Sequence, residues 1–204
     1  VFAKDGFNAV AQDSFSSKTY SSMKYTATTM PNKMYIYVTK PTISLDPSSP
    51  ASGAHTADPM DDIFYFDIAA DVLGDVTMKT LKITLNSDAD FDTAATVSAK
   101  IVDPDTGTVL LAPVNVSFSS SSIATLTWTD TVTVPAATTR RFDLIMDTES
   151  LLDEDAGIDD PLTLSINLGT AGSAGGIIWN DGLKNVTWFG NLSSTTLMSN
   201  TVQF

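Results

Sequence analysis

The chain has 204 residues, a formal net charge of −13 at pH 7 and no cysteine. The negative charge argues against a nucleic-acid backbone or an anionic membrane surface as partner, because like charges repel over a Debye length of about 8 Å. The lack of cysteine excludes disulfides, thiolate nucleophiles and zinc–thiolate or iron–sulfur sites. Ser and Thr fill 50 positions, and the sequence has no run of about 18 apolar residues that would predict a membrane span.

Residues 1–32 form a hydroxyl-rich segment with spaced aromatic side chains and weak helical periodicity. Because Ser and Thr disfavour a helix, we expect an extended arm here, followed by a β-sandwich domain over residues 33–204. The arm is expected to pack on its own sandwich or on a neighbouring copy. Its candidate assembly residues are aromatic or apolar: Phe15, Tyr20, Met23 and Tyr25.

The rest of the chain alternates apolar and polar residues with a period of two, which indicates strands with one buried face. In residues 124–134, "ATLTWTDTVTV", Leu126 and Trp128 share the apolar face and Thr residues occupy the other. Residues 62–70, "DIFYFDIAA", are apolar on both faces, so this strand should lie centrally or beneath another segment. Further strands are expected at residues 81–85, 114–118, 141–147 and 161–168.

Turn signals separate these strands at regular intervals, which favours an antiparallel, immunoglobulin-like β-sandwich over alternating strands and helices. The best hairpin candidate is "DPDTG" at residues 103–107, where Pro104 presets φ and Gly107 can adopt positive φ. The side chains predicted to fill the core between the sheets are Leu126, Trp128, Leu144, Leu164 and Ile166.

Four short motifs occur in a recognisable order: "KPTISLDPSSPASG", "FDIAADVLGDVTMKTLKITL", "RRFDLIMDTES" and "IIWNDG". Over residues 40–182 the chain resembles the β-sandwich modules of large secreted surface proteins of candidate-phylum bacteria. The resemblance implies a part of a surface layer, stalk or adhesin, without catalytic residues. Such modules usually belong to longer chains, whereas we expect this chain to be a single unit, which points to a subunit that assembles with copies of itself.

The most acidic stretch, "DTESLLDEDAGIDD" at residues 147–160, places seven carboxylates between two predicted strands. Calcium binds six to eight oxygens, often from loop carboxylates, and Gly157 would allow a sharp turn. The alternative is a hairpin loop that charge keeps soluble. Residues 58–62 and 87–92 are weaker acidic candidates. The predicted calcium ligands are Asp153, Asp155, Asp159 and Asp160.

Catalytic patterns are weak, and we expect no enzyme. Paired carboxylates can hydrolyse glycosides, but those of this chain fall mainly in turns. His55 is the only histidine, and no G-x-S-x-G motif surrounds any serine. The glycines of residues 169–176 lack the lysine and the helix of a phosphate-binding loop. No cofactor other than calcium is predicted.

A carbohydrate-binding or adhesive module is the alternative function, since tryptophan side chains can stack on sugars. Trp128 lies on the apolar face of its strand, whereas Trp179 and Trp188 flank "NDGLKN" and are the better candidates for exposure. Burial of both remains the simpler alternative. Three sequons provide candidate glycosylation sites, which matter only in a host that glycosylates exported proteins: Asn115, Asn185 and Asn191.

Together these features predict a structural subunit of an extracellular cell-surface assembly, such as a filament, a pilus-like fibre or a surface layer. The expected partners are copies of the chain itself, with surface glycans as the alternative. The first residue is Val1 rather than Met, which suggests a processed N-terminus or an excised fragment, and of the two we expect a removed export signal. The N-terminal arm is the favoured donor of a strand to a neighbour, and the uncharged C-terminal residues 195–204 are the second choice.

Overall fold

Strands make up nearly all the regular structure of the computed structural model, which describes residues 8–10, 17–19, 37–87, 96–117, 123–151, 161–170, 173–189 and 195–204. The chain divides into two units, residues 1–37 and residues 38–204. In the first unit, β1 (Asn8–Val10) pairs antiparallel with β2 (Ser17–Thr19). Among the described residues, the second unit contains the other strands and one 3-10 turn, η1 (Glu149–Leu151).

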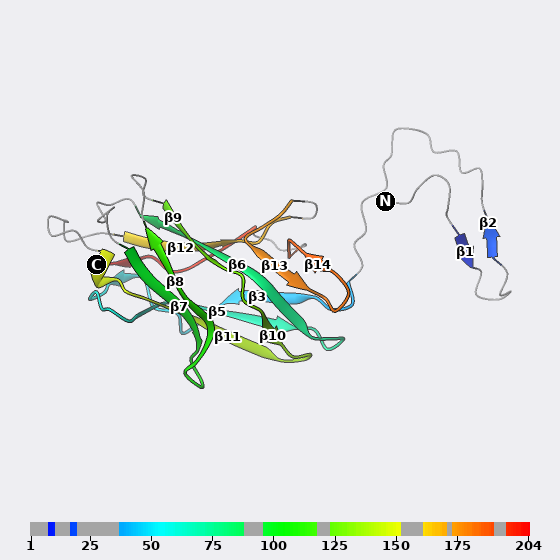
Figure 1. The fold of residues 1–204 in the computed structure, drawn as a ribbon, viewed down its shortest axis with the longest axis horizontal. Coiled ribbons are helices and arrows are strands. Elements are labelled where there is room, and N and C mark those ends of the chain that lie inside the picture. Colours follow the sequence, from blue (N-terminus) through cyan, green and yellow to red (C-terminus); the bar gives the residue numbers. More distant parts are fainter. Residues whose placement is uncertain are drawn as a thin grey trace. The chain divides into compact units, whose positions relative to one another are not determined.

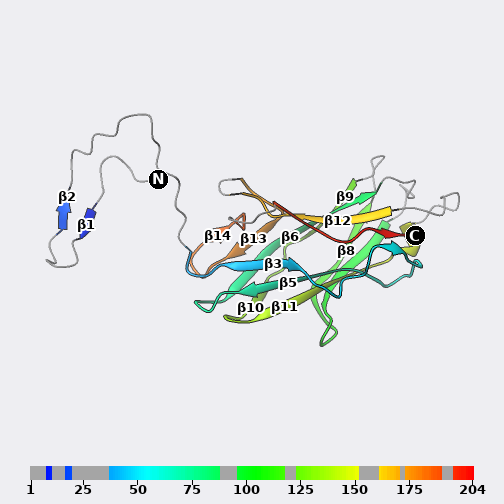
Figure 2. The same cartoon turned by 180° about the vertical axis from the view of Figure 1, so that it is seen from behind.

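Five strands form the first sheet of residues 38–204, and every pairing in it is antiparallel. Figure 2 shows β3, β5 and β11 running alongside one another. The order across the sheet is β3 (Pro41–Leu45), β5 (Asp61–Ala70), β11 (Thr139–Met146), β7 (Thr96–Asp103) and β8 (Thr108–Ser117).

Nine strands form the second sheet, which is built around the long strand β6 (Val76–Ser87). On one side β6 pairs with β9 (Ile123–Trp128) and β10 (Val132–Val134). On its other side β6 pairs with β13 (Ile177–Asn180), which in turn pairs with β14 (Asn185–Val186). On the same side β6 pairs with β12 (Pro161–Asn167), and β12 also pairs with β15 (Thr196–Met198) and β16 (Val202–Gln203). β4 (Gly53–Ala54) pairs with β16 at the edge.

The two sheets pack face to face, as Figure 1 shows, and the alternating apolar residues of both meet between them. The rings of Phe66 and Phe142 stack with centroids 5.2 Å apart, and Phe64 lies 5.2 Å from Phe66. The five core residues predicted from alternation are all buried: Leu126, Trp128, Leu144, Leu164 and Ile166. The predicted all-β sandwich is therefore confirmed, while its immunoglobulin-like detail stays a prediction.

The predicted central position of residues 62–70 is confirmed, because β5 lies between β3 and β11. The predicted hairpin at residues 103–107 is also confirmed. Gly107 has φ 67° and donates its N–H to the carbonyl of Asp103 at 2.7 Å, which closes the turn between β7 and β8.

One expectation about strand pairing is wrong. The strands that flank the acidic stretch do not form a hairpin, because β11 belongs to the five-stranded sheet and β12 to the nine-stranded sheet. The stretch therefore leads from one sheet to the other. The predicted antiparallel arrangement is confirmed, and the short pairing of β16 with β4 is the one parallel pairing among the described strands.

The C-terminal residues 195–204, the second candidate donor of an assembly strand, belong to the sandwich of their own chain. β15 and β16 pair with β12, and Val202 is buried. His55 donates its N–H to the carbonyl of Gln203 at 2.7 Å. Exchange of this segment between copies would break these bonds first.

Candidate functional site

The outer face of the five-stranded sheet carries a cluster of titratable side chains, which we call the carboxyl cluster. β5 contributes Asp62, Tyr65 and Asp67, β11 contributes Arg141 and Asp143, and Asp46 follows β3 directly. Antiparallel pairing places Arg141 opposite Asp67 and Asp143 opposite Tyr65. Residues remote in sequence therefore meet because three neighbouring strands present the same face.

Arg141 holds one half of the carboxyl cluster together. Its Nε lies 2.8 Å from Oδ2 of Asp46 and 3.9 Å from Oδ1 of Asp67. Oδ1 of Asp46 also accepts hydrogen bonds from the backbone N–H of Ser48, at 2.7 Å, and from its hydroxyl. Burial on its own would raise the pKa of Asp46, but the hydrogen bonds from Ser48 and the charge of Arg141 outweigh it and hold the pKa below its usual value. Burial, followed by the neighbouring Asp46, raises the pKa of Asp67.

Asp143 occupies the other half and is almost completely buried, with a relative exposure of 3%. Its Oδ1 has no hydrogen-bond partner among the described residues. Burial, followed by the charge of Asp62 and a hydrogen bond to it, raises the pKa of Asp143 to about 7, and Arg141 opposes this only in part. Asp143 therefore retains its proton at pH values where an exposed aspartate has lost it.

Tyr65 lies across the strand pair from Asp143. Burial, followed by the charges of Asp143 and Asp62, raises the pKa of Tyr65 to about 12, so its hydroxyl stays protonated. The carboxyl cluster thus holds a proton on Asp143 beside a phenol that can donate a hydrogen bond. Within the described ranges, no group of three or more His, Cys, Asp or Glu side chains is arranged to hold a metal ion.

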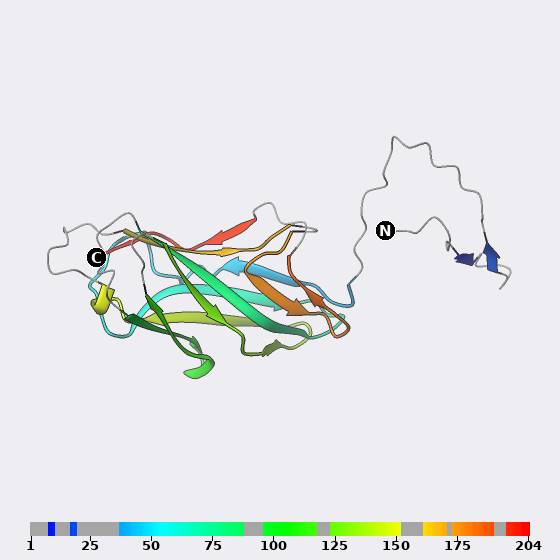
Figure 3. The ribbon, with the colours of Figure 1, turned by 45° about the horizontal axis from the view of Figure 1, so that its top comes forward.

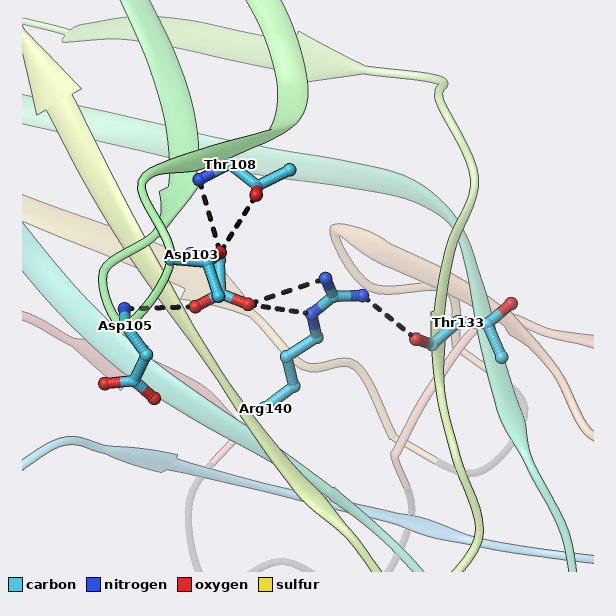
Figure 4. A network of polar contacts seen from close by, with 6 residues as sticks. Asp103, Asp105, Thr108, Thr133 and Arg140 are labelled. Atoms are coloured by element: carbon cyan, nitrogen blue, oxygen red, sulfur yellow. Dashed lines mark hydrogen bonds and ion pairs between the residues drawn. The ribbon is translucent and has the colours of Figure 1, made fainter.

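A second polar network joins the two sheets at one edge (Figure 4). Arg140 of β11 places its Nε 3.5 Å from Oδ2 of Asp103, the last residue of β7. Its Nη1 donates to the carbonyl oxygen of Thr133 in β10 at 3.3 Å. Because β10 belongs to the nine-stranded sheet, one guanidinium group spans the gap between the sheets.

Trp128 makes a second link between the sheets. Its indole Nε1 donates to the carbonyl oxygen of Ala112 in β8 at 2.8 Å, and the N–H of Ala112 donates to Oδ2 of Asp130 at 3.4 Å. Pro113 comes next in β8 and has no N–H. Together these features occupy or remove hydrogen-bonding groups along the edge strand β8, which is how natural proteins protect a sheet edge.

The edge strand β9 differs from β8. Among the strands that the structure describes, β9 pairs only with β6. Its sequence, "IATLTW", contains neither charge nor proline, and Ile123, Thr125 and Thr127 are exposed. An edge of this kind presents backbone N–H and C=O groups to a further strand.

Most of the predicted site residues lie outside the described residues. This holds for the calcium ligands Asp153, Asp155, Asp159 and Asp160, for the assembly residues Phe15, Tyr20, Met23 and Tyr25, and for the sequon Asn191. Calcium binding therefore stays a prediction. The other two sequon residues, Asn115 in β8 and Asn185 in β14, are exposed, and Oδ1 of Asn185 accepts a hydrogen bond from Nδ2 of Asn180 at 2.8 Å.

The tryptophans do not form the platform considered for sugar binding. Trp128 and Trp179 are buried, and Nε1 of Trp179 donates to the carbonyl oxygen of Trp188 at 3.1 Å. Only Trp188 is partly accessible. His55 contacts Phe204 edge to face and lies within hydrogen-bonding distance of the carbonyl of Ala51.

Sequence reasoning missed the carboxyl cluster, because alternation assigned Arg141 and Asp143 only to a polar face. One signal was present: residues 62–70 are apolar on both faces, which indicates that the outer face of this part of the sheet is partly covered. An aspartate on the adjacent strand could then be buried. The partner strand itself could not be inferred from alternation.

No protein-family model and no curated protein matches this chain. In the part of the chain that is described, no helix has the length and apolar character needed to cross a lipid bilayer.

Proposed function

We propose that this chain is a structural subunit of an extracellular cell-surface assembly, a filament, a pilus-like fibre or a surface layer. In this proposal the N-terminal segment of one copy adds as a strand to the sandwich of the next copy. The resemblance to secreted surface modules and the weakness of catalytic patterns support this class of function. The observation that carries the proposal is the edge of β9, which pairs only with β6 among the described strands and meets β8 through the bond from Trp128 to Ala112.

β9 offers six uncharged residues in a row at the edge of a large sheet. Proteins that remain monomeric usually protect such edges with charge, proline or a covering segment. β8 has this protection through Pro113 and the bonds of Ala112, whereas β9 has no charge and no proline of its own. The difference between the two edge strands favours β9 as an acceptor of a partner strand.

The donor is assigned to the N-terminal segment by elimination within the chain. The C-terminal strands β15 and β16 are already paired with β12. Residues 1–37 form a unit separate from the sandwich, and the assembly residues Phe15, Tyr20, Met23 and Tyr25 belong to it. A strand added to β9 would gain main-chain hydrogen bonds, while these side chains would fix its register. Head-to-tail repetition then produces an open filament when the rotation between copies does not close a ring.

Deletion of residues 1–30 tests the donor. We expect a folded monomer that no longer forms particles or filaments in negative-stain micrographs, with sedimentation giving the mass of one chain. An unfolded product, or assembly that equals that of the full chain, would contradict strand donation.

A double substitution, Thr125→Lys and Thr127→Lys, tests the acceptor. Both side chains are exposed, so the fold should tolerate lysine, but charge on an edge strand opposes pairing with another chain. Thr42→Lys with Ser44→Lys is the matched control, since both residues are exposed on the edge strand β3 of the other sheet. Loss of assembly in the β9 variant alone supports the assignment, and loss in the β3 variant alone would transfer the acceptor to β3.

A further inference from the structure

Four exposed apolar side chains gather at one end of the sandwich, and we call them the apolar end. Their relative exposures are 42% for Val38, 74% for Val72, 72% for Leu73 and 81% for Leu183. Val38 precedes β3, Val72 and Leu73 lie in the turn between β5 and β6, and Leu183 lies in the turn between β13 and β14. Figures 1 and 3 both show the start of β3 and these two turns at the same end.

Hydrogen bonds tie the three segments together. The N–H of Val38 donates to Oδ2 of Asp181 at 3.3 Å, and Oδ1 of Asp181 accepts from the N–H of Leu183 at 3.0 Å. On the other side, the hydroxyl of Thr39 donates to the carbonyl of Gly74 at 2.8 Å. A Cβ atom placed on Gly74 would lie 3.9 Å from Cγ1 of Val38. Residues 38 and 39 therefore bridge the two turns, and the apolar end is one continuous region.

The turns themselves do not need apolar side chains at their tips. Oδ1 of Asp71 accepts the N–H of Leu73 at 3.0 Å, and Oδ1 of Asp75 accepts the N–H of Ala136 at 2.8 Å. These aspartates shape the turn, as polar residues commonly do. Single exposed apolar side chains are normal on a protein surface, but a group of them indicates a contact site. Nothing within the described sandwich covers this group.

We infer that the apolar end packs against the sandwich of a second copy, the copy that accepts the N-terminal strand. This inference rests on the proposed function. Val38 directly follows residues 1–37, so any donated strand leaves the sandwich at the apolar end. Tyr25, the assembly residue nearest to Val38, is separated from it by 13 residue steps, which span at most about 45 Å when fully extended. The site that accepts Tyr25 must therefore lie within about 45 Å of this end.

Charge gives a second reason for an apolar contact. Each copy carries a formal charge of −13, so two copies repel each other at low ionic strength. The four side chains of the apolar end are uncharged, and their burial releases water without adding repulsion. Assembly is accordingly expected to strengthen as salt rises, because salt screens the repulsion but leaves the apolar contact intact.

The test uses Leu73→Ser with Leu183→Ser in the full chain. Removing two exposed leucines should leave the melting temperature unchanged and raise the concentration needed for assembly by at least about tenfold. The matched control is Met60→Ser with Val109→Ser, whose wild-type side chains are 56% and 49% exposed elsewhere on the sandwich. This control should assemble like the wild-type chain. If the leucine double variant melts early, Leu183→Lys alone is measured instead, since Leu183 is the most exposed of the four.

Comparison with the deletion of residues 1–30 separates this inference from the proposed function. Loss of assembly in the deletion and in the leucine double variant supports both strand donation and the contact at the apolar end. Loss in the deletion together with wild-type assembly of the leucine variant overturns the contact at the apolar end and leaves strand donation intact. Loss in the leucine variant with normal assembly of the deletion supports the apolar contact and overturns strand donation. A wild-type chain that stays monomeric at all salt concentrations overturns both.

Discussion

The side chain of Asp143 occupies an outward-facing position of β11 and yet is buried. It lies opposite Tyr65 on one neighbouring strand and opposite Val102 on the other. These side chains, together with Asp62 and Arg141, replace the water that an aspartate on a sheet surface would have. A charged carboxylate without full hydrogen bonding is costly in such a place, so the proton remains on the group to a higher pH.

This arrangement makes the stability of the chain depend on pH. The pKa of Asp143 is raised from 3.8 to about 7, so between these values the folded chain binds a proton that the unfolded chain has released. Its contribution to the free energy of unfolding is complete below about pH 4 and is lost as the pH rises to about 7. We expect Asp143→Asn to remove this loss, because an amide does not titrate. Urea unfolding at intervals from pH 4.5 to pH 8 measures the difference.

The variant should gain stability relative to the wild-type chain as the pH rises, and the gain should level off above pH 7. Asp105→Asn, at an exposed turn position, is the control and should follow the wild-type curve. Parallel curves for Asp143→Asn and the wild-type chain would show that Asp143 keeps an ordinary pKa. The pKa of Asp46 is lowered instead of raised. Its contribution to the free energy of unfolding therefore changes only at pH values below the range of this experiment.

At the scale of elements, the hairpin between β7 and β8 depends on one backbone conformation. Gly107 adopts φ 67°, which L-residues other than Asn and Asp rarely adopt, and a Cβ atom there would meet nothing within 4 Å. Gly107→Ala should therefore lower the free energy of unfolding by about 1 kcal/mol through backbone strain alone. Gly107→Asn should cost less. Chemical denaturation of the two variants compares them directly, and an equal loss for both would point to a cause other than φ.

Alternation predicted which residues each element buries, but not which element lies beside it. The strands at residues 141–147 and 161–168 each have a clear apolar face, and their nearness in sequence suggested a hairpin. They belong to different sheets because the sandwich needs a connection between its layers, and period-two alternation looks the same in either sheet. For the same reason the carboxyl cluster could not be predicted: its members meet only once β3, β5 and β11 are known to be neighbours.

At the scale of the whole molecule, the core between the sheets holds the sandwich together. Leu164 in β12 is fully buried and lies opposite Leu85 of β6. We expect Leu164→Ala to lower the free energy of unfolding by about 2 to 5 kcal/mol, from lost burial and from the cavity left behind. Thr163→Ala, at a half-buried neighbouring position, serves as the comparison. A change near zero for Leu164→Ala would mean that the site relaxes fully or that Leu164 is exposed in solution.

The fold class and most of the core were predictable because composition and alternation both respond to the burial of one face of each strand. The apolar end was not predicted, since Val72, Leu73 and Leu183 stand in turns, where apolar residues carry no periodic signal. Their closeness depends on Asp181 bonding Val38 across 143 positions of sequence. Interactions of that range follow from the completed topology and not from any local pattern.

The way the chain enters the sandwich also determines how it would bear a load. Val38 is followed by β3, whose residues pair antiparallel with β5 from Pro41 opposite Ala70 to Leu45 opposite Phe66. Hydrogen bonds in such a ladder run perpendicular to the strands. A pull on the residues before Val38, directed along β3, would therefore strain all the bonds of this pair at once instead of opening them one after another. A fibre whose subunits were joined through this segment would carry tension in shear, the direction in which a pair of strands resists separation best.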